Sequence, residues 1–219
     1  MPAILFDLDG TLVDSLSDIA GALNHMRGLH RLSPLPLETV RKFVGRGLEH
    51  LVKQAFPELS SEQSDELIEK YRSYYLEHAC STGTLYPGVR ETLEALRQKP
   101  GLKLGIVTNK PSLIADKTLA HYLPGFHFDA VAGPERVAER KPSPRHLLDV
   151  LARLEVEPAD AWYVGDHPVD EQCARAAGVR FLGAGYGFGG IKIDDARMIQ
   201  SFPQILVKAP AQDVMGRRG

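Results

Sequence analysis

An apolar run at residues 3–6, which ends in two aspartates and a glycine, constrains the fold of this chain more than any other segment. A short run of this kind, bounded by a turn, is typical of a strand buried on both faces of a parallel sheet. Asp7 and Asp9 follow the run, and Gly10 permits a tight turn after them. Because ligands bind beyond the carboxyl ends of such strands, the two carboxylates are predicted to face a binding site. An ordinary surface turn is the alternative for residues 7–10 taken alone.

Further apolar runs alternate with helical patterns along the rest of the chain. The runs lie at residues 103–108, 130–132, 161–165 and 179–182. The helical patterns lie at residues 89–97, 112–121, 144–154 and 169–177. This alternation is typical of consecutive βαβ units. The sequence therefore predicts an α/β fold with a doubly wound parallel sheet, Rossmann-like in its layers.

Residues 14–83 are expected to form a helical cap domain inserted into that fold. Helical patterns occur at residues 15–29, 37–44, 48–55 and 61–80, with hardly any strand pattern among them. The α/β core is then expected from residues 1–13 and 84–207. Residues 208–219 lack periodicity and are expected to be a flexible tail. An insertion after the first strand is well placed to cover the carboxyl ends of the sheet as a lid.

The composition excludes several classes of partner. The chain has 219 residues, of which 43% are hydrophobic and 25% charged, enough for a full core in one or two domains. Its formal net charge of -2 argues against nucleic acid, and no apolar run reaches the roughly 18 residues that span a membrane. Cys80 and Cys173 lack metal-ligand spacing and the N-terminus lacks a signal-peptide pattern, so free thiols in the cytoplasm are expected. A monomer and a homodimer both remain open.

Two polar segments follow later apolar runs. Thr108 and Asn109 end one run, where a hydroxyl and backbone N–H groups could bind phosphate oxygens, although Thr108 could instead cap a helix. Lys141 and Pro142 are expected to open the next helix, with Pro142 in its first turn. A lysine taken alone is usually a solvated surface group, so Lys141 gains weight only from its neighbours.

Two more acids, Asp166 and Asp170, follow the run at residues 161–165. Taken alone, they are a turn residue and an acid in the first turn of a helix. The glycine-rich residues 183–190 lack a clear following helix, so we expect a mobile loop near the site rather than a dinucleotide-binding loop. Four polar segments that each follow a predicted strand or precede a helix favour one shared site.

The strings ILFDLDGTLVDS, VTNKP, RKPSP and YVGDHPVD, in this order, resemble the four motifs of the haloacid dehalogenase superfamily, most of whose members are phosphohydrolases. The resemblance covers about residues 3–190 and is strongest to the phosphoglycolate phosphatase branch, which has a helical cap after the first motif. The chain departs from that branch at His167 and Pro168, where relatives commonly carry Ser and a polar residue. The departure leaves the role of Asp166 intact but bears on local contacts and substrate preference.

This resemblance implies a Mg²⁺-dependent phosphomonoester hydrolase that acts through an aspartyl phosphate. Asp7 would be the nucleophile, and Asp9 would be the general acid and base. Asp7, the backbone carbonyl of Asp9 and Asp166 would hold Mg²⁺, a hard cation that prefers oxygen ligands. Asp170 would lie behind these ligands and orient a metal-bound water or Lys141.

The resemblance also implies a phosphate-binding set. Thr108, Asn109 and Lys141 would bind the phosphate, together with N–H groups near Leu8 and Asp9. Elementary electrostatics asks for such partners independently, because a carboxylate that attacks a phosphate dianion meets like-charge repulsion. Positive charge from Mg²⁺ and Lys141 would offset that repulsion where charge develops.

The substrate expected from the resemblance is a small phosphorylated metabolite, with 2-phosphoglycolate as the leading candidate. Gly45 and Gly47 flank Arg46 in a predicted connection between two cap helices, which would let that arginine reach an anionic group of the substrate. A plain turn with a solvated Arg46 is the alternative.

Rival functions share most of these residues. A sugar-phosphate phosphatase, a pyrophosphatase or a phosphomutase would carry the same core motifs and differ in the cap. A dehalogenase is disfavoured because Asp9 is present. A non-catalytic binding module on the same fold would be expected to lack one of Asp7, Asp9, Lys141 and Asp166, and all four are present.

Overall fold

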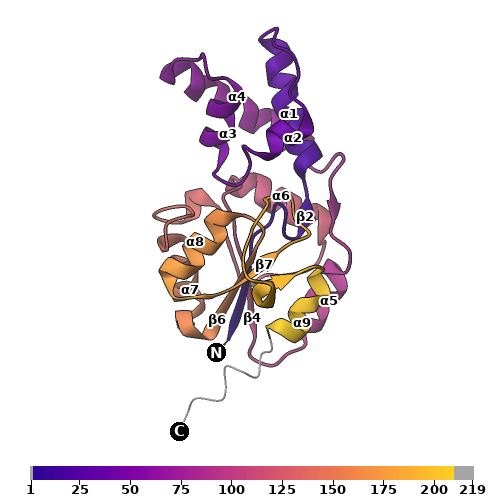
Figure 1. Ribbon diagram of the computed structural model, residues 1–219, viewed down its shortest axis with the longest axis vertical. Coiled ribbons are helices and arrows are strands. Elements are labelled where there is room, and N and C mark those ends of the chain that lie inside the picture. Colours follow the sequence, from indigo (N-terminus) through magenta and orange to yellow (C-terminus); the bar gives the residue numbers. More distant parts are fainter. Residues whose placement is uncertain (1, 210–219) are drawn as a thin grey trace.

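The protein is represented by a computed structural model (Figure 1), and the structure describes residues 2–209. Its centre is a six-stranded sheet in the order β5-β4-β1-β6-β7-β8, in which every neighbouring pair is parallel. The strands are β1 (Ala3–Phe6), β4 (Lys103–Val107), β5 (Ala130–Ala132), β6 (Ala161–Gly165), β7 (Arg180–Ala184) and β8 (Met198–Ile199).

The side chains of β1 alternate between the two faces of this sheet. Ile4 and Phe6 belong to one hydrophobic cluster, whereas Ala3 and Leu5 belong to the other. All four are at most 1% exposed, as expected for a central parallel strand whose run is apolar throughout. The alternation follows from the two-residue period of a strand.

Helices cover both faces of the sheet. In Figure 1, α7 and α8 lie on the left of the sheet, and α5 and α9 lie on the right. The core helices are α5 (Val89–Arg97), α6 (Ser112–Tyr122), α7 (Arg145–Leu154), α8 (Pro168–Ala177) and α9 (Ile205–Lys208). Short 3-10 turns are η1 (Pro134–Arg136), η2 (Pro158–Asp160), η3 (Asp195–Arg197) and η4 (Phe202–Gln204).

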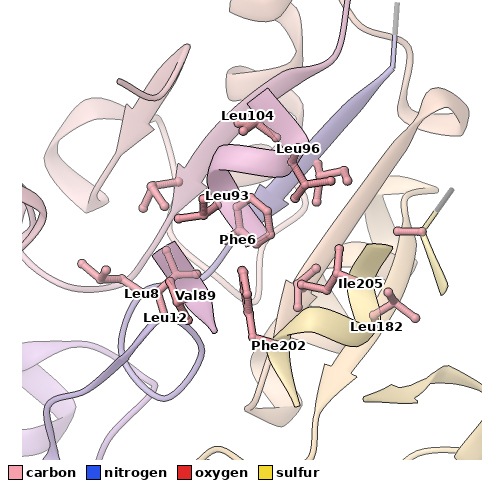
Figure 2. Close-up of a cluster of buried hydrophobic side chains, with 14 of the residues drawn as sticks. Phe6, Leu8, Leu12, Val89, Leu93, Leu96, Leu104, Leu182, Phe202 and Ile205 are labelled. Atoms are coloured by element: carbon pink, nitrogen blue, oxygen red, sulfur yellow. The ribbon is translucent and has the colours of Figure 1, made fainter. Parts of the chain in front are cut away.

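The cluster between the sheet and α5 holds the first strand in place. Figure 2 shows Phe6 between Leu93 of α5 and Phe202, and the Phe6 and Phe202 rings lie 5.6 Å apart. Ile205 of α9 closes the same cluster. Burial of these large side chains stabilises the strand that leads to Asp7, at about 25 cal/mol for each Å² of apolar surface removed from water.

The helical insertion lies beyond the carboxyl ends of the strands (Figure 1). It contains α1 (Leu16–Leu29), α2 (Leu37–Arg41), α3 (Leu48–Ala55) and α4 (Ser61–His78). These helices share a hydrophobic cluster of their own, to which α6 adds Ile114. The chain enters the insertion through β2 (Val13–Asp14) and leaves it through β3 (Thr84–Leu85), which pair antiparallel. The predicted fold class, a doubly wound parallel α/β sheet with an inserted helical cap, is confirmed.

Several element boundaries differ from the sequence expectations. The helix expected at 37–44 ends at Arg41, ahead of turns that lead to Gly45 with φ +106°. The helix expected at 61–80 ends at His78, because the backbone is already extended at Ala79, with ψ 149°, and turns into a left-handed conformation at Cys80, with φ +67°.

The expectation that Lys141 and Pro142 open a helix is wrong. The next helix, α7, begins at Arg145, and residues 141–144 form turns. The Lys141 N–H is held by Asn109 Oδ1 at 3.1 Å, a bond to another part of the chain. The lysine is therefore held in a turn between β5 and α7 rather than inside the helix.

Two features of the C-terminal part of the core were not expected. The strand expected at 179–182 spans Arg180–Ala184, because Gly183 and Ala184 pair with the short β8. Lys208 and Ala209 were expected in the tail, but Lys208 ends α9 and Ala209 is buried in the core. The rest of the expected tail, residues 210–219, lies outside the described residues.

Two compositional expectations concern cysteines and membranes. Cys80 and Cys173 are both free thiols. Within residues 2–209, no helix is both long enough and apolar enough to cross a membrane.

Candidate active site

The register of the central strands brings three of the four motif segments to one edge of the sheet. Phe6 of β1 pairs with Ile106 of β4 on one side and with Val164 of β6 on the other. The residues that follow these strands therefore lie side by side at the carboxyl edge. Asp7 comes from β1 and Asp166 from β6, both buried, and Thr108 follows β4.

A buried acidic cluster lies at this edge. One carboxylate oxygen from each of Asp7, Asp166 and Asp170 lies within 4.8 Å of the others. Burial raises the pKa of Asp7 to about 7, although Lys141 opposes the shift. Burial, with the nearby carboxylates of Asp170 and Asp7, raises the pKa of Asp166 well above its usual value. Three buried oxygen donors that repel one another are a suitable environment for a hard cation.

Lys141 neutralises part of the negative charge of this cluster. Its Nζ lies 2.7 Å from Asp170 Oδ1 and 2.9 Å from Asp7 Oδ1, and donates to the hydroxyl of Tyr163 at 2.8 Å. Burial alone would lower the pKa of Lys141, but the Asp170 and Asp7 carboxylates outweigh it and hold the pKa above its usual value. With 1% of its side chain exposed, Lys141 is a buried cation and not a solvated surface group.

Glycines allow the backbone to close around Asp166. Gly10 has φ +83°, and a Cβ at that position would fall 1.9 Å from Asp166 Oδ2. A Cβ on Gly187 would fall 2.4 Å from the Cβ of Asp166, and the N–H of Gly189 donates to Asp166 Oδ2 at 2.6 Å. The glycine-rich segment therefore lies at the site, where it holds an acid, and its first residues, Gly183 and Ala184, belong to β7.

Asp9 lies in a second group of contacts that reaches the insertion. Its Oδ1 accepts hydrogen bonds from Ser15 Oγ at 2.5 Å and from Lys110 Nζ at 2.8 Å. Lys110 Nζ also donates to the hydroxyl of Tyr75, which lies on α4, at 2.8 Å. Lys110 was missed in the sequence, although the VTNKP string places it directly after Asn109 at a strand end.

Thr108 and Asn109 are both buried but make different contacts. Thr108 Oγ1 accepts from the N–H of Lys110 at 3.1 Å, the bond of a residue that caps a turn. Asn109 Nδ2 donates to the carbonyls of Lys141 and Gly45, each at 3.0 Å. The Asn109 side chain thus ties the lysine turn to the insertion loop.

A small cavity of about 60 Å³ lies between the insertion and the core. Asp9, Asn109 and Lys110 line it from the core, and Leu48 and Tyr75 are among the residues that line it from the insertion. The lining is mostly apolar on the insertion side.

Arg46 lies next to this cavity along the chain but does not line it. Its neighbour Gly47 does line the cavity, whereas the Arg46 side chain is exposed. The loop itself contacts the core, since a Cβ on Gly45 would fall 2.5 Å from the His167 ring.

His167 caps the helix that carries Asp170. Its Nδ1 accepts from the N–H of Val169 at 3.1 Å, and Asp170 Oδ2 accepts from the N–H of His167 at 3.0 Å. Burial lowers the pKa of His167, which favours the neutral ring that this acceptor role requires. Pro168 occupies the first turn of α8, where its missing N–H costs nothing. The departure at these two positions is therefore compatible with a well-formed helix start.

The sheet, its acidic edge and the buried lysine define a hydrolase core of the α/β class with a helical cap. A family model described as haloacid dehalogenase-like hydrolase matches residues 4–184, and the chain belongs to this family.

Individual relatives narrow the comparison. The chain is 39% identical to a phosphoglycolate phosphatase of Chromobacterium violaceum over an alignment of 191 residues. The alignment covers 85% of this chain and 86% of the relative. It is 36% identical to a phosphoglycolate phosphatase of Aquifex aeolicus over an alignment of 211 residues, and this alignment covers 95% of this chain and 96% of the relative. The crystal structure of a predicted phosphoglycolate phosphatase from Haemophilus somnus superimposes with a TM-score of 0.87 at 30% identity, covering 95% of this chain and 98% of that one.

Proposed function

We propose that this protein hydrolyses the phosphomonoester of a small metabolite through an aspartyl phosphate, with 2-phosphoglycolate as the substrate. The observation that carries the proposal is the position of Asp7, whose carboxylate lies 2.9 Å from Lys141 Nζ and beside the carboxylates of Asp166 and Asp170. The similarity to phosphoglycolate phosphatases across most of the chain supports the choice of substrate.

In this proposal Asp7 attacks phosphorus and displaces the alkoxide of the substrate. The attack brings a carboxylate against a phosphate dianion, so its barrier depends on positive charge held nearby. Lys141 supplies that charge without needing to move, because Asp170 and Tyr163 fix its Nζ from the other side. Water then attacks the aspartyl phosphate and releases inorganic phosphate.

Asp9 serves as the acid and then as the base. Asp9 follows Asp7 by two residues in the sequence, and it lies on the side of the site that faces the cavity. From there it can protonate the leaving alkoxide and later take a proton from the attacking water. Ser15 and Lys110 orient the carboxyl through their bonds to Oδ1.

The residues at this edge fit a magnesium ion. The Oδ1 atom of Asp7 is buried, yet it receives no aligned hydrogen bond from any described residue. It therefore has a lone pair available for a metal ion. Asp7, Asp166 and the backbone carbonyl of Asp9 would hold the ion, and Asp170 would keep Lys141 in place behind them. Bound there, Mg²⁺ supplies positive charge to the phosphate oxygens.

The remaining residues bind phosphate or govern access. Thr108, Asn109 and N–H groups near Asp9 would complete the phosphate cradle with Lys141. Residues 14–83 would act as the cap over the core formed by residues 1–13 and 84–207, with Arg46 on the cap loop contributing to substrate choice.

The cellular setting is also part of the proposal. Free thiols at Cys80 and Cys173 suit a reducing cytoplasm. The protein would work there as a monomer or a homodimer, with a small phosphorylated molecule as its partner.

A screen of phosphorylated metabolites with purified protein and Mg²⁺ tests the proposal. We expect phosphate release to be fastest from 2-phosphoglycolate, to stop in excess chelator and to return when Mg²⁺ is restored. A clear preference for a sugar phosphate or for pyrophosphate would assign the protein to another phosphoryl enzyme on this fold. The absence of hydrolysis with every compound would point to a binding module.

A further inference from the structure

We propose that Lys110 binds the carboxylate of the substrate and thereby selects 2-phosphoglycolate over uncharged esters of the same size. This inference rests on the proposed function and adds a carboxylate subsite to it. The subsite lies on the core side of the cavity, immediately next to Asp9, and not on the loop that carries Arg46.

Lys110 has the donor capacity for such a ligand. Its ammonium has three N–H donors. Two of them meet Asp9 Oδ1 and the Tyr75 hydroxyl, each at 2.8 Å. Nζ also lies 4.7 Å from the centre of the Tyr75 ring, but among residues 2–209 no further hydrogen-bond acceptor for it is seen, and 2% of the side chain is exposed. One donor therefore remains for a bound acceptor inside the site.

The cavity beside Lys110 matches a very small leaving group. Its volume is about 60 Å³. A water requires about 10–15 Å³ measured in this way, so the space holds roughly four to six non-hydrogen atoms. The glycolyl group beyond its ester oxygen has four: a methylene carbon, a carboxyl carbon and two oxygens.

A carboxylate in that cavity needs a cation, because an unpaired buried charge is expensive. Among the described residues that line the cavity, Lys110 is the one that carries a positive charge, and Leu48 and Leu51 offer only apolar contact. Arg46 is exposed and outside the lining.

The length of the substrate points to the same residue. In 2-phosphoglycolate the carboxyl carbon is two bonds from the ester oxygen, so its oxygens lie no more than about 4 Å from that oxygen. The ester oxygen must itself lie within about 3 Å of the acid that protonates it, which is Asp9. A cation that meets the carboxylate must therefore be a close neighbour of Asp9, as Lys110 is at 2.8 Å.

The position of Lys110 also resolves an electrostatic conflict. The carboxylate of the substrate would otherwise lie against the Asp9 carboxylate after the proton has left. A shared ammonium between the two lowers that repulsion, because opposite charges at this distance attract more strongly where water is excluded. An ester without a carboxylate has no such conflict and gains nothing from the lysine beyond its contact with Asp9.

Two substrates separate this role from a general one. We would measure kcat/KM for 2-phosphoglycolate and for 2-hydroxyethyl phosphate, which replaces the carboxylate with a hydroxymethyl group. Lys110→Met and Lys110→Gln should lower the ratio of the two values roughly 10- to 150-fold, the range for loss of a charge-assisted hydrogen bond. Two variants are used so that a folding defect in one leaves the test intact.

Lys117→Met is the matched control. Lys117 also joins core and insertion, through bonds from its Nζ to the carbonyls of Leu76 and Glu77, but it does not line the cavity. Its replacement should leave the ratio of kcat/KM values unchanged.

The outcomes separate the inference from the proposed function. Equal losses on both substrates in the Lys110 variants would confine Lys110 to its contact with Asp9 and overturn the inference alone. So would a ratio that falls in Arg46→Ala and not in the Lys110 variants. Wild-type protein that hydrolyses neither compound would overturn the proposed function, and the carboxylate subsite with it.

Discussion

The two halves of the site are held together in different ways. The core half consists of Asp7, Lys141, Asp166 and Asp170, whose mutual contacts all lie within the α/β core. The cap-facing half consists of Asp9, Ser15, Lys110 and Tyr75, and its contacts run from the core to α4.

This difference shows which part of the site depends on the insertion. The core half is fixed by strand register, by the start of α8 and by the turn that holds Lys141, so its mutual contacts do not involve the helical cap. The cap-facing half is complete only while α4 lies against the core, because Tyr75 supplies one of the two partners of Lys110. Changes in the core half should therefore affect every substrate, whereas changes in the cap-facing half should depend on the substrate and on cap position.

The largest effect is expected at Asp7 in the core half. Asp7→Asn should reduce kcat by at least about 10⁴-fold on every phosphoester, because an amide cannot form the acyl phosphate. The fold should survive, since a neutral amide avoids burying a charge. Phosphate-release assays and the melting temperature measure the two effects. Near-normal turnover in a preparation free of contaminating phosphatase would exclude the covalent mechanism.

A smaller loss is expected at Asp9 in the cap-facing half. Asp9→Asn keeps the backbone carbonyl for a metal but removes the proton donor, so kcat should fall by about 10²- to 10⁴-fold. Esters with good leaving groups, such as aryl phosphates, need less protonation and should lose less. Parallel assays on an alkyl and an aryl phosphate check this, and a loss under tenfold on the alkyl ester would argue against the acid role.

Acid should weaken the core half through His146. Its Nδ1 accepts from the Lys141 N–H at 3.2 Å, and burial lowers the pKa of His146 to about 4. The unfolded chain binds a proton near pH 6.5, whereas the folded ring stays neutral to about pH 4. The free energy of unfolding should therefore fall as the pH drops through this interval, by about 3 kcal/mol from this group.

Urea denaturation of wild type and His146→Gln at pH 6.5 and pH 4.5 measures that contribution. The variant should lose less stability on acidification than the wild type, because glutamine does not titrate. Identical losses in the two proteins would show that the ring is not buried neutral.

The smallest effect is expected at Tyr75. Tyr75→Phe removes one partner of Lys110 but leaves the charge, so kcat/KM should fall only about fivefold, in line with roughly 1 kcal/mol for one hydrogen bond. Tyr74→Phe is the control, because Tyr74 lies on the same helix and stacks between His25 and His78. Equal effects of the two changes would show that the contact between Lys110 and Tyr75 does not support catalysis.

The sequence was sufficient to predict the fold because its strongest signals are local. The apolar run before Asp7 and the later runs at 130–132 and 161–165 coincide with β1, β5 and β6. A buried parallel strand must be apolar throughout, so its sequence identifies it without reference to its neighbours. The short β8 gave no such signal, because its two residues pair only in the context of β7.

The contacts within the site were harder to predict, for a physical reason. The positions of Asp7 and Asp166 can be predicted because each follows an apolar strand. The direction of the Lys110 side chain, by contrast, depends on Tyr75, which lies on a helix remote in sequence. The role of His167 as a helix cap depends in the same way on the rotation of its ring. Packing of a remote helix sets the first and a side-chain rotation sets the second, and no spacing rule encodes either.

The antiparallel pair β2–β3 has a consequence for how such proteins diversify. Val13 pairs with Leu85 and Asp14 with Thr84, so the chain leaves the core and returns to it at neighbouring points, about 4.8 Å apart as in any sheet. In topology, the whole helical insertion is therefore one loop of a β-hairpin. The entropic cost of closing such a loop grows only slowly with its length. Evolution could exchange or enlarge everything beyond this pair while Asp7, Lys141, Asp166 and Asp170 kept their geometry.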